Sequence, residues 1–164
     1  MTKDILLKVF EHNNWANAQI IQTCSTLTDE QLDAEPQSAT HGSIRATLTH
    51  LVMSQRGYLA LLTLPLEERP TAPLEFAELE ESARLSGEGL LALIREENSF
   101  PKDRLRTRDG YYAEPWLVMV QIINHATEHR EQIKNMLSAL GVTPPDIDGW
   151  DYGLATNTLF PIAA

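Results

Sequence analysis

The stretch that decides the fold runs over residues 118–137, VMVQIINHATEHREQIKNML, and contains two histidines four positions apart, His125 and His129. Residues i and i+4 of an α-helix lie only about 40° apart around the helix axis, so both imidazoles point to the same side. They interrupt an apolar stripe that recurs every three or four residues and predicts a helix facing a core. The stripe consists of Val118, Ile122, Ile133, Met136 and Leu140.

Imidazoles on a core-facing stripe need polar partners. A buried polar group without a hydrogen bond costs roughly 1–3 kcal/mol, and a shared metal ion is one way to satisfy two facing imidazoles. Structural histidines are the alternative, because any helix with two histidines can show this spacing. His50 lies at the edge of the apolar stripe of another helical segment and is a candidate third ligand. Three nitrogen ligands from two helices, with a fourth position open, are typical of a catalytic zinc site.

Three further segments, at residues 3–24, 44–64 and 74–97, have the periodicity of amphipathic helices. The length of 164 residues corresponds to one domain, so the sequence predicts a single all-α domain over residues 1–164. We expect the first helix to turn one line of apolar residues toward the core: Ile5, Val9, Ala16 and Ile20.

Local signals mark the ends of several elements. Thr28 and Gln31 form a capping box ahead of a short helix. The pair Asp109-Gly110 predicts a type I′ turn in a small hairpin. Pro115 and Gly141 suit the start and the end of the histidine-bearing helix. The tail over residues 146–164 is rich in turn formers, yet we expect its large apolar residues to pack on the body: Ile147, Trp150, Tyr152, Leu154, Leu159 and Phe160.

Charge and composition narrow the classes of function. A formal net charge of −10 argues against nucleic acid as a partner, because such binding depends on clustered basic residues. No run of about 18 apolar residues is present, so no membrane span is predicted. The single cysteine, Cys24, and a start without a secretory signal lead us to expect a cytoplasmic protein.

Two other side chains are candidates for roles beside the histidines. The run His125 to His129 formally matches the H-x-x-E-H motif of inverted zincins, but Glu128 lies on the side of His125 away from His129. Glu128 is therefore expected to be solvated or to support a ligand. His12, on the inward stripe of the first helix, could join or orient the site, although a packed structural histidine is the favoured interpretation. His41 is expected in an exposed loop.

Several motifs together resemble a known family, the DinB/YfiT-like metalloenzymes, whose DinB is unrelated to the DNA polymerase of that name. The resemblance covers nearly the whole chain, and its most specific part is the run over residues 123–132 with the Pro-Pro-Asp that follows. The matching motifs are Asn14-Trp15-Ala16-Asn17, Leu27 to Leu32, Thr49-His50-Leu51, Ile123 to Gln132 and Leu140 to Asp146.

The resemblance implies a four-helix bundle of up-down-down-up order, usually dimeric, with a divalent metal held by three histidines. The ligands fall on His50, His125 and His129. Some relatives are transferases or isomerases that use low-molecular-weight thiols such as bacillithiol or mycothiol. We therefore expect a homodimeric enzyme that holds Zn²⁺ or Ni²⁺ and performs thiol S-transfer to a small-molecule electrophile.

Two other functions remain open from the sequence. The same ion could activate water for hydrolysis, or the protein could be a non-enzymatic metal-binding protein of the stress response or of partner binding. Dimerisation finds further support in a second apolar face on the histidine helix, for which packing of the tail is the alternative explanation. That face consists of Trp116, Met119, Val120 and Ile123.

Overall fold

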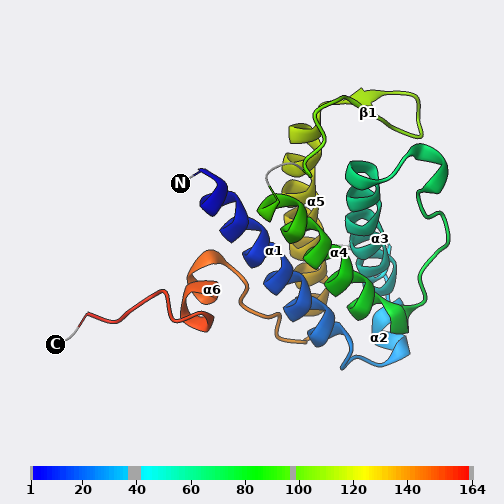
Figure 1. Ribbon diagram of the computed structural model, residues 1–164. Helices are drawn as coiled ribbons and strands as arrows, with labels where there is room; N and C mark the ends of the chain where they lie inside the picture. Colours follow the sequence, from blue (N-terminus) through cyan, green and yellow to red (C-terminus); the bar gives the residue numbers. More distant parts are fainter. Residues whose placement is uncertain (1, 37–41, 97–98, 163–164) are drawn as a thin grey trace.

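Helices dominate the computed structural model, which describes residues 2–36, 42–96 and 99–162 (Figure 1). His41 lies outside these residues. The predicted all-α class is confirmed. The four long helices are α1 (Thr2–Cys24), α3 (Ile44–Thr63), α4 (Leu79–Arg95) and α5 (Pro115–Ala139). The shorter elements are α2 (Asp29–Asp33), η1 (Leu66–Glu68), η2 (Phe76–Glu78), β1 (Leu105–Arg106), β2 (Tyr112–Ala113) and α6 (Gly149–Ala155).

The four long helices pack around a shared interior. Helix α1 contacts α4 and α5, and α3 contacts the same two helices. The side chain of Lys3 donates a hydrogen bond of 2.8 Å to the carbonyl of Arg95, so the start of α1 lies beside the end of α4. Buried apolar residues form two clusters, one that includes Leu48 and Ile133 and one that includes Phe10 and Ile122. No helix in the described ranges is long and apolar enough to cross a membrane.

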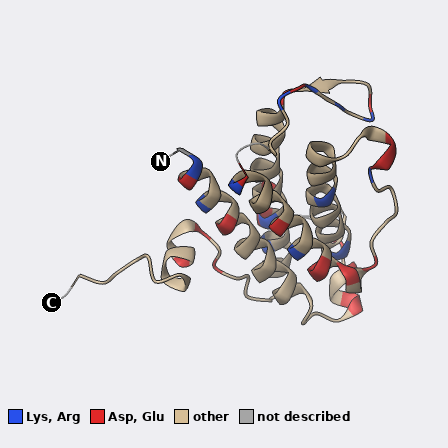
Figure 2. Cartoon of the chain, viewed as in Figure 1, with Lys and Arg blue, Asp and Glu red and all other residues tan. Residues whose placement is uncertain are grey.

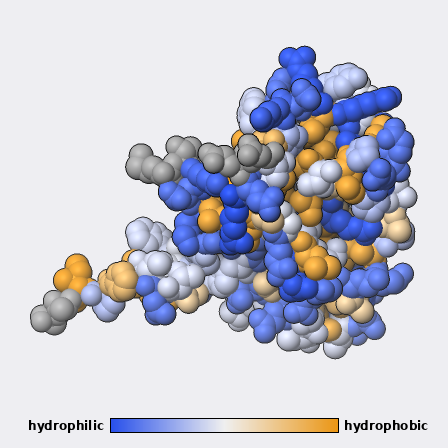
Figure 3. Space-filling view, in the orientation of Figure 1, coloured by the Kyte–Doolittle hydropathy of each residue, from blue (hydrophilic) through white to orange (hydrophobic). Residues whose placement is uncertain are grey.

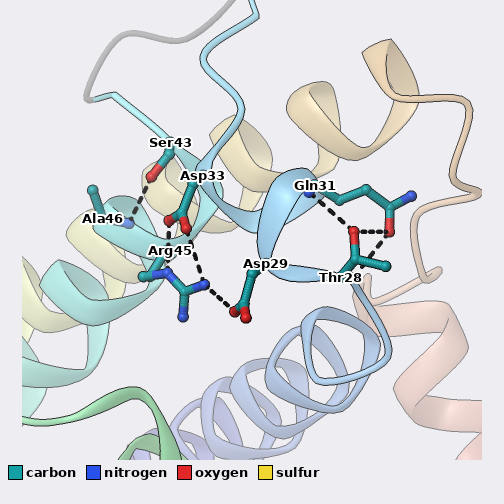
Figure 4. Close-up of polar contacts among 7 residues, drawn as sticks. All are labelled: Thr28, Asp29, Gln31, Asp33, Ser43, Arg45 and Ala46. Atoms are coloured by element: carbon teal, nitrogen blue, oxygen red, sulfur yellow. Dashed lines mark hydrogen bonds and ion pairs between the residues drawn. The ribbon is translucent and has the colours of Figure 1, made fainter.

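The predicted capping box is confirmed at the end of the molecule where α2 meets α3 (Figure 4). Thr28 and Gln31 form the capping box of α2, and Ser43 accepts a hydrogen bond from the Ala46 amide as the N-cap of α3. The guanidinium of Arg45 donates to Asp29 and Asp33 at 2.6 Å each. These bonds hold α2 against the first turn of α3, and the hydrogen bond from Arg45 lowers the pKa of Asp33.

Two glycines of α4 allow close contact with neighbouring helices. A Cβ atom at Gly87 would lie 2.7 Å from the side chain of Asn14 on α1, and one at Gly89 would lie 2.6 Å from that of Leu59 on α3. Because glycine has no side chain, the backbone of α4 can lie close to α1 and α3 at these two positions. At the end of α5, Gly141 has a φ of +73° and closes the helix, as predicted.

The predicted inward face of α1 is wrong in its first half. Ile5 is 60% and Val9 is 38% exposed, whereas Phe10 is fully buried. The buried face of α1 also contains Asn13 and Asn17, both almost completely buried. Because two residues of the buried face are polar, a search for apolar periodicity did not identify this face.

The remaining differences lie in the connections. Helix α4 begins at Leu79 and not at residue 74, because residues 76–78 form the 3₁₀ turn η2. The hairpin pairs Leu105 with Ala113. Its predicted type I′ turn is wrong, since that turn needs positive φ at both central residues and Gly110, but not Asp109, has one. The amide of Thr107 instead donates to the Tyr111 carbonyl at 2.8 Å, across a longer loop.

The tail also differs from expectation. It contains the helix α6, started by a capping box of Asp148 and Asp151. Ile147 is buried and the ring of Tyr152 packs against His12 and Trp15 of α1, as predicted. Trp150 is 70% and Phe160 is 74% exposed, so the predicted packing of these two residues on the body is wrong. Figure 3 shows hydrophobic residues along the tail, away from the body of the molecule.

Candidate metal centre

Three histidines from two helices come together at one point. The Nε2 atom of His125 lies 3.0 Å from Nε2 of His50 and 3.1 Å from Nε2 of His129. His50 belongs to α3, whereas His125 and His129 occupy successive turns of α5. One ligand atom from each lies within 4.8 Å of the others, so the cluster could hold a metal ion.

The helices position these side chains by their apolar faces. In α5, the residues Ile122 and Ile133 on either side of the histidine pair are buried against α3 and the other helices, which turns both imidazoles toward α3. In α3, Leu51 is buried and the neighbouring His50 is exposed at the edge of the packed face. The cluster therefore runs from the interior, where His129 is 3% exposed, to the surface.

Gln132 orients the innermost ligand. Its Oε1 atom lies 2.7 Å from Nδ1 of His129. An amide oxygen only accepts hydrogen bonds, so Nδ1 of His129 carries the proton. In the neutral ring Nε2 then holds a lone pair, and this atom faces the other two histidines. An outer partner that fixes the tautomer in this way is typical of histidine ligands of metals.

The lone pairs and hydrogens available at the three nitrogens favour a shared metal over hydrogen bonds alone. A neutral imidazole nitrogen has either one hydrogen or one lone pair. Nε2 of His125 therefore forms a good hydrogen bond with only one of its two neighbours at 3.0 and 3.1 Å. A divalent ion accepts lone pairs from all three, and tetrahedral ligands about 2.0–2.1 Å from zinc lie about 3.3 Å from one another.

A buried polar network lies directly behind the ligands. Arg130, next to His129 in sequence and 4% exposed, donates from Nη1 to Oδ1 of Asn13 and of Asn17 at 2.7 Å each. Asn17 in turn donates to Gln55 of α3 at 2.9 Å. The network links α1, α3 and α5 and provides a donor for the buried Oδ1 atoms of Asn13 and Asn17. Burial lowers the pKa of Arg130 to about 10.

Tyr58 of α3 borders the cluster on its other side. Its ring packs edge-on against that of His125, with the centroids 5.7 Å apart. Sequence analysis missed both Tyr58 and Gln132. A signal existed in each case, because Gln132 is three residues after His129 and Tyr58 is eight residues after His50, which are helical spacings.

The other candidates from the sequence lie apart from the ligands. His12 contacts the tail, with Nε2 2.9 Å from the carbonyl of Ile147 and its ring against Trp15 and Tyr152. It is the structural histidine that the sequence favoured. Glu128 is exposed. Burial raises the pKa of the Cys24 thiol to about 12, which keeps it protonated at neutral pH.

Comparison with known proteins identifies the family of this chain. The chain is similar to Protein DinB of Bacillus subtilis (strain 168), with 28% identity over 168 residues that cover 94% of this chain and 97% of that protein. The family model described as DinB family matches residues 1–158. This match includes all three histidines of the cluster, and the chain belongs to the DinB family.

Proposed function

We propose that this protein is a metal-dependent enzyme in which His50, His125 and His129 bind one Zn²⁺ or Ni²⁺ ion. The reaction that we assign to it is transfer of a low-molecular-weight thiol to a small electrophile. The observation that carries the proposal is the convergence of three Nε2 atoms, with Gln132 fixing the lone pair of His129 toward the other two histidines. Imidazole nitrogen suits both metals, so the donor set leaves the choice between them to experiment.

A divalent ion at this position favours the thiolate form of a coordinated thiol, which is the nucleophilic form. The chain's own residues hold the site in place. Gln132 orients His129, and Arg130 fixes this turn of α5 to α1 through Asn13 and Asn17. In the reaction the thiol proton passes to solvent, sulfur bonds to the electrophilic carbon, and the leaving group departs with its bonding electrons.

Hydrolysis is the less favoured alternative. Metal-assisted hydrolysis commonly uses a carboxylate as general base, and among the described residues the cluster contains only the three histidines. Glu128, the glutamate of the H-x-x-E-H match, is exposed. A thiol ionises at a much lower pH than water and has less need of such a base.

The proposal includes the family's architecture. We infer a single domain over residues 1–164 whose four long helices form an up-down-down-up bundle, supported by the contacts of α1 and α3 with α4 and α5. We also infer a cytoplasmic location, which suits the buried, free thiol of Cys24.

A homodimer is also part of the proposal. Trp116, Leu117 and Val120 are 61%, 47% and 48% exposed on α5, and such a group of large apolar side chains usually marks a partner surface. Met119, which the sequence assigned to that face, is instead 5% exposed in the core.

The experiment is a turnover assay with zinc-loaded and nickel-loaded protein. A chromogenic aryl chloride serves as electrophile, and cysteine, coenzyme A and glutathione serve as thiols. We expect metal-dependent product with at least one thiol, absent in His125→Ala and unchanged in the matched surface variant Glu128→Gln. A fully metal-loaded protein that turns over no thiol, but hydrolyses an ester panel, would support the hydrolase. Inertness in both assays would support the non-enzymatic alternative in metal binding, stress response or partner interaction.

A further inference from the structure

A cavity of about 260 Å³ lies next to the histidine cluster. Its wall on α3 includes Ser54, Gly57 and Tyr58, and the opposite walls contribute Arg69 from the linker after η1 and Arg108 from the hairpin loop. Tyr58 borders both the cavity and the cluster, because its ring also packs against His125 at 5.7 Å. A molecule in the cavity is therefore separated from the ligands by one side chain.

The position on α3 indicates how far the two sites lie from each other. Ser54 and Tyr58 follow His50 by four and eight residues and so lie about 40° and 80° from it around the helix axis. At a rise of about 1.5 Å per residue they are about 6 and 12 Å along the axis from His50. A small molecule bound between the arginines could extend past Tyr58 to the histidines.

The two arginines form a basic wall in an acidic protein. Arg69 donates to the carbonyls of Leu64 and Arg106, and Arg108 donates to the carbonyl of Arg69 at 2.7 Å. These bonds hold the linker and the hairpin together. In Figure 2 the hairpin at the top has blue segments, and the linker at the right has both red and blue segments. Among the described residues, neither guanidinium forms an ion pair with a carboxylate, so both retain N–H donors for a ligand. Partial burial, and after it the charge of Arg108, lower the pKa of Arg69.

We propose that this cavity binds a carboxylate group of one of the enzyme's small-molecule reactants, with Arg69 and Arg108 as the recognising residues. The planar guanidinium matches a carboxylate by paired N–H donors, and a negative ligand relieves the repulsion between the two cations. Only the statement that the ligand is a reactant of the enzyme rests on the proposed function. Carboxylate binding itself needs no metal.

The glycine in the wall provides a sharp test. A Cβ atom at Gly57 would meet no atom within 4 Å, and Gly57 lines the cavity, so a larger side chain there starts in open space and takes up room in the cavity. Gly57→Leu also replaces a helical glycine by a better helix former. Arg108→Gln removes one recognising charge and leaves both hydrogen bonds of the Arg69 side chain intact. Arg106→Gln is the matched control, because it removes a hairpin arginine whose side chain does not line the cavity.

The probe is benzoate, with benzamide as its neutral counterpart, titrated into metal-free and zinc-loaded protein by calorimetry. We expect benzoate to bind both forms and benzamide to bind neither well. Gly57→Leu and Arg108→Gln should weaken benzoate binding about tenfold or more, Arg106→Gln should leave it unchanged, and all three variants should keep their metal.

Three results would overturn the inference. Benzoate binding that needs zinc and is lost in His125→Ala, but not in Arg108→Gln, would place the carboxylate on the metal. Equal binding of benzamide would remove the role of charge, and tighter binding of inorganic phosphate would replace carboxylate as the ligand class. None of these results touches the metal content or the thiol assay, so failure here is distinct from failure of the proposed function.

Discussion

Gln132→Leu tests how the innermost ligand is prepared for a metal. The substitution removes the acceptor 2.7 Å from Nδ1 of His129 and keeps a side chain of similar size. His129 is 3% exposed, so water has little access to replace the lost oxygen. A buried donor left without a partner costs about 1–3 kcal/mol. The ring avoids this cost if its proton moves to Nε2, the atom that faces the other histidines. An Nδ1–H without a partner and a protonated Nε2 both weaken metal binding, by about 10- to 100-fold.

The assay is competition for zinc between metal-free, untagged protein and a chromogenic chelator. Gln121→Leu is the matched control, because Gln121 is an exposed glutamine of the same helix. We expect Gln121→Leu to bind zinc like the wild type. Gln132→Glu keeps an acceptor, adds a negative charge and should bind at least as tightly as the wild type. Wild-type affinity in Gln132→Leu would refute the role assigned to this hydrogen bond.

Three further predictions concern stability and assembly. Gly57→Ala should stabilise the protein by up to about 1 kcal/mol in urea unfolding, because its Cβ meets open space. Gly87→Ala should destabilise it by about 1–3 kcal/mol, because its Cβ would lie 2.7 Å from the side chain of Asn14. Equal effects of the two substitutions would contradict the packing described for α4. Val120→Asp, at an exposed site on α5, should convert the dimer to a monomer in light scattering and keep its metal, and a monomeric wild type would end the dimer proposal. Chelation should leave the circular dichroism of the helices unchanged and lower the melting temperature modestly, since both hydrophobic clusters form without the histidines; loss of the helical signal would show that the metal is needed for folding.

The sequence located the histidine cluster because its signals are local. His125 and His129 are four residues apart in a strongly periodic helix, and the edge position of His50 on α3 is visible in the same way. That α3 and α5 would meet at these residues came from the family resemblance and not from periodicity. The cavity residues Arg69 and Arg108 were not predictable, because their meeting depends on how the linker and the hairpin fold against each other.

Helix α1 shows why part of the core was misplaced. Its inward face contains Asn13 and Asn17, which accept hydrogen bonds from Arg130 of α5, more than a hundred positions away in sequence. A search that considers only apolar residues therefore assigns Ile5 and Val9 to the inward face of this helix, although both are exposed. The prediction that Trp150 and Phe160 of the tail pack on the body failed for a different reason. The capping box of Asp148 and Asp151 was a readable start signal for α6, whereas nothing local tells whether Trp150 is covered.

The central claim is that His50, His125 and His129 bind one divalent ion, and elemental analysis of the untagged protein after dialysis against zinc or nickel tests it most directly. The account predicts about one ion per chain. His50→Ala, His125→Ala and His129→Ala should each lose most of it, while His12→Ala, which removes contacts with Trp15 and the tail, should keep it. A metal-free wild type, or full occupancy in any of the three ligand variants, would contradict the account.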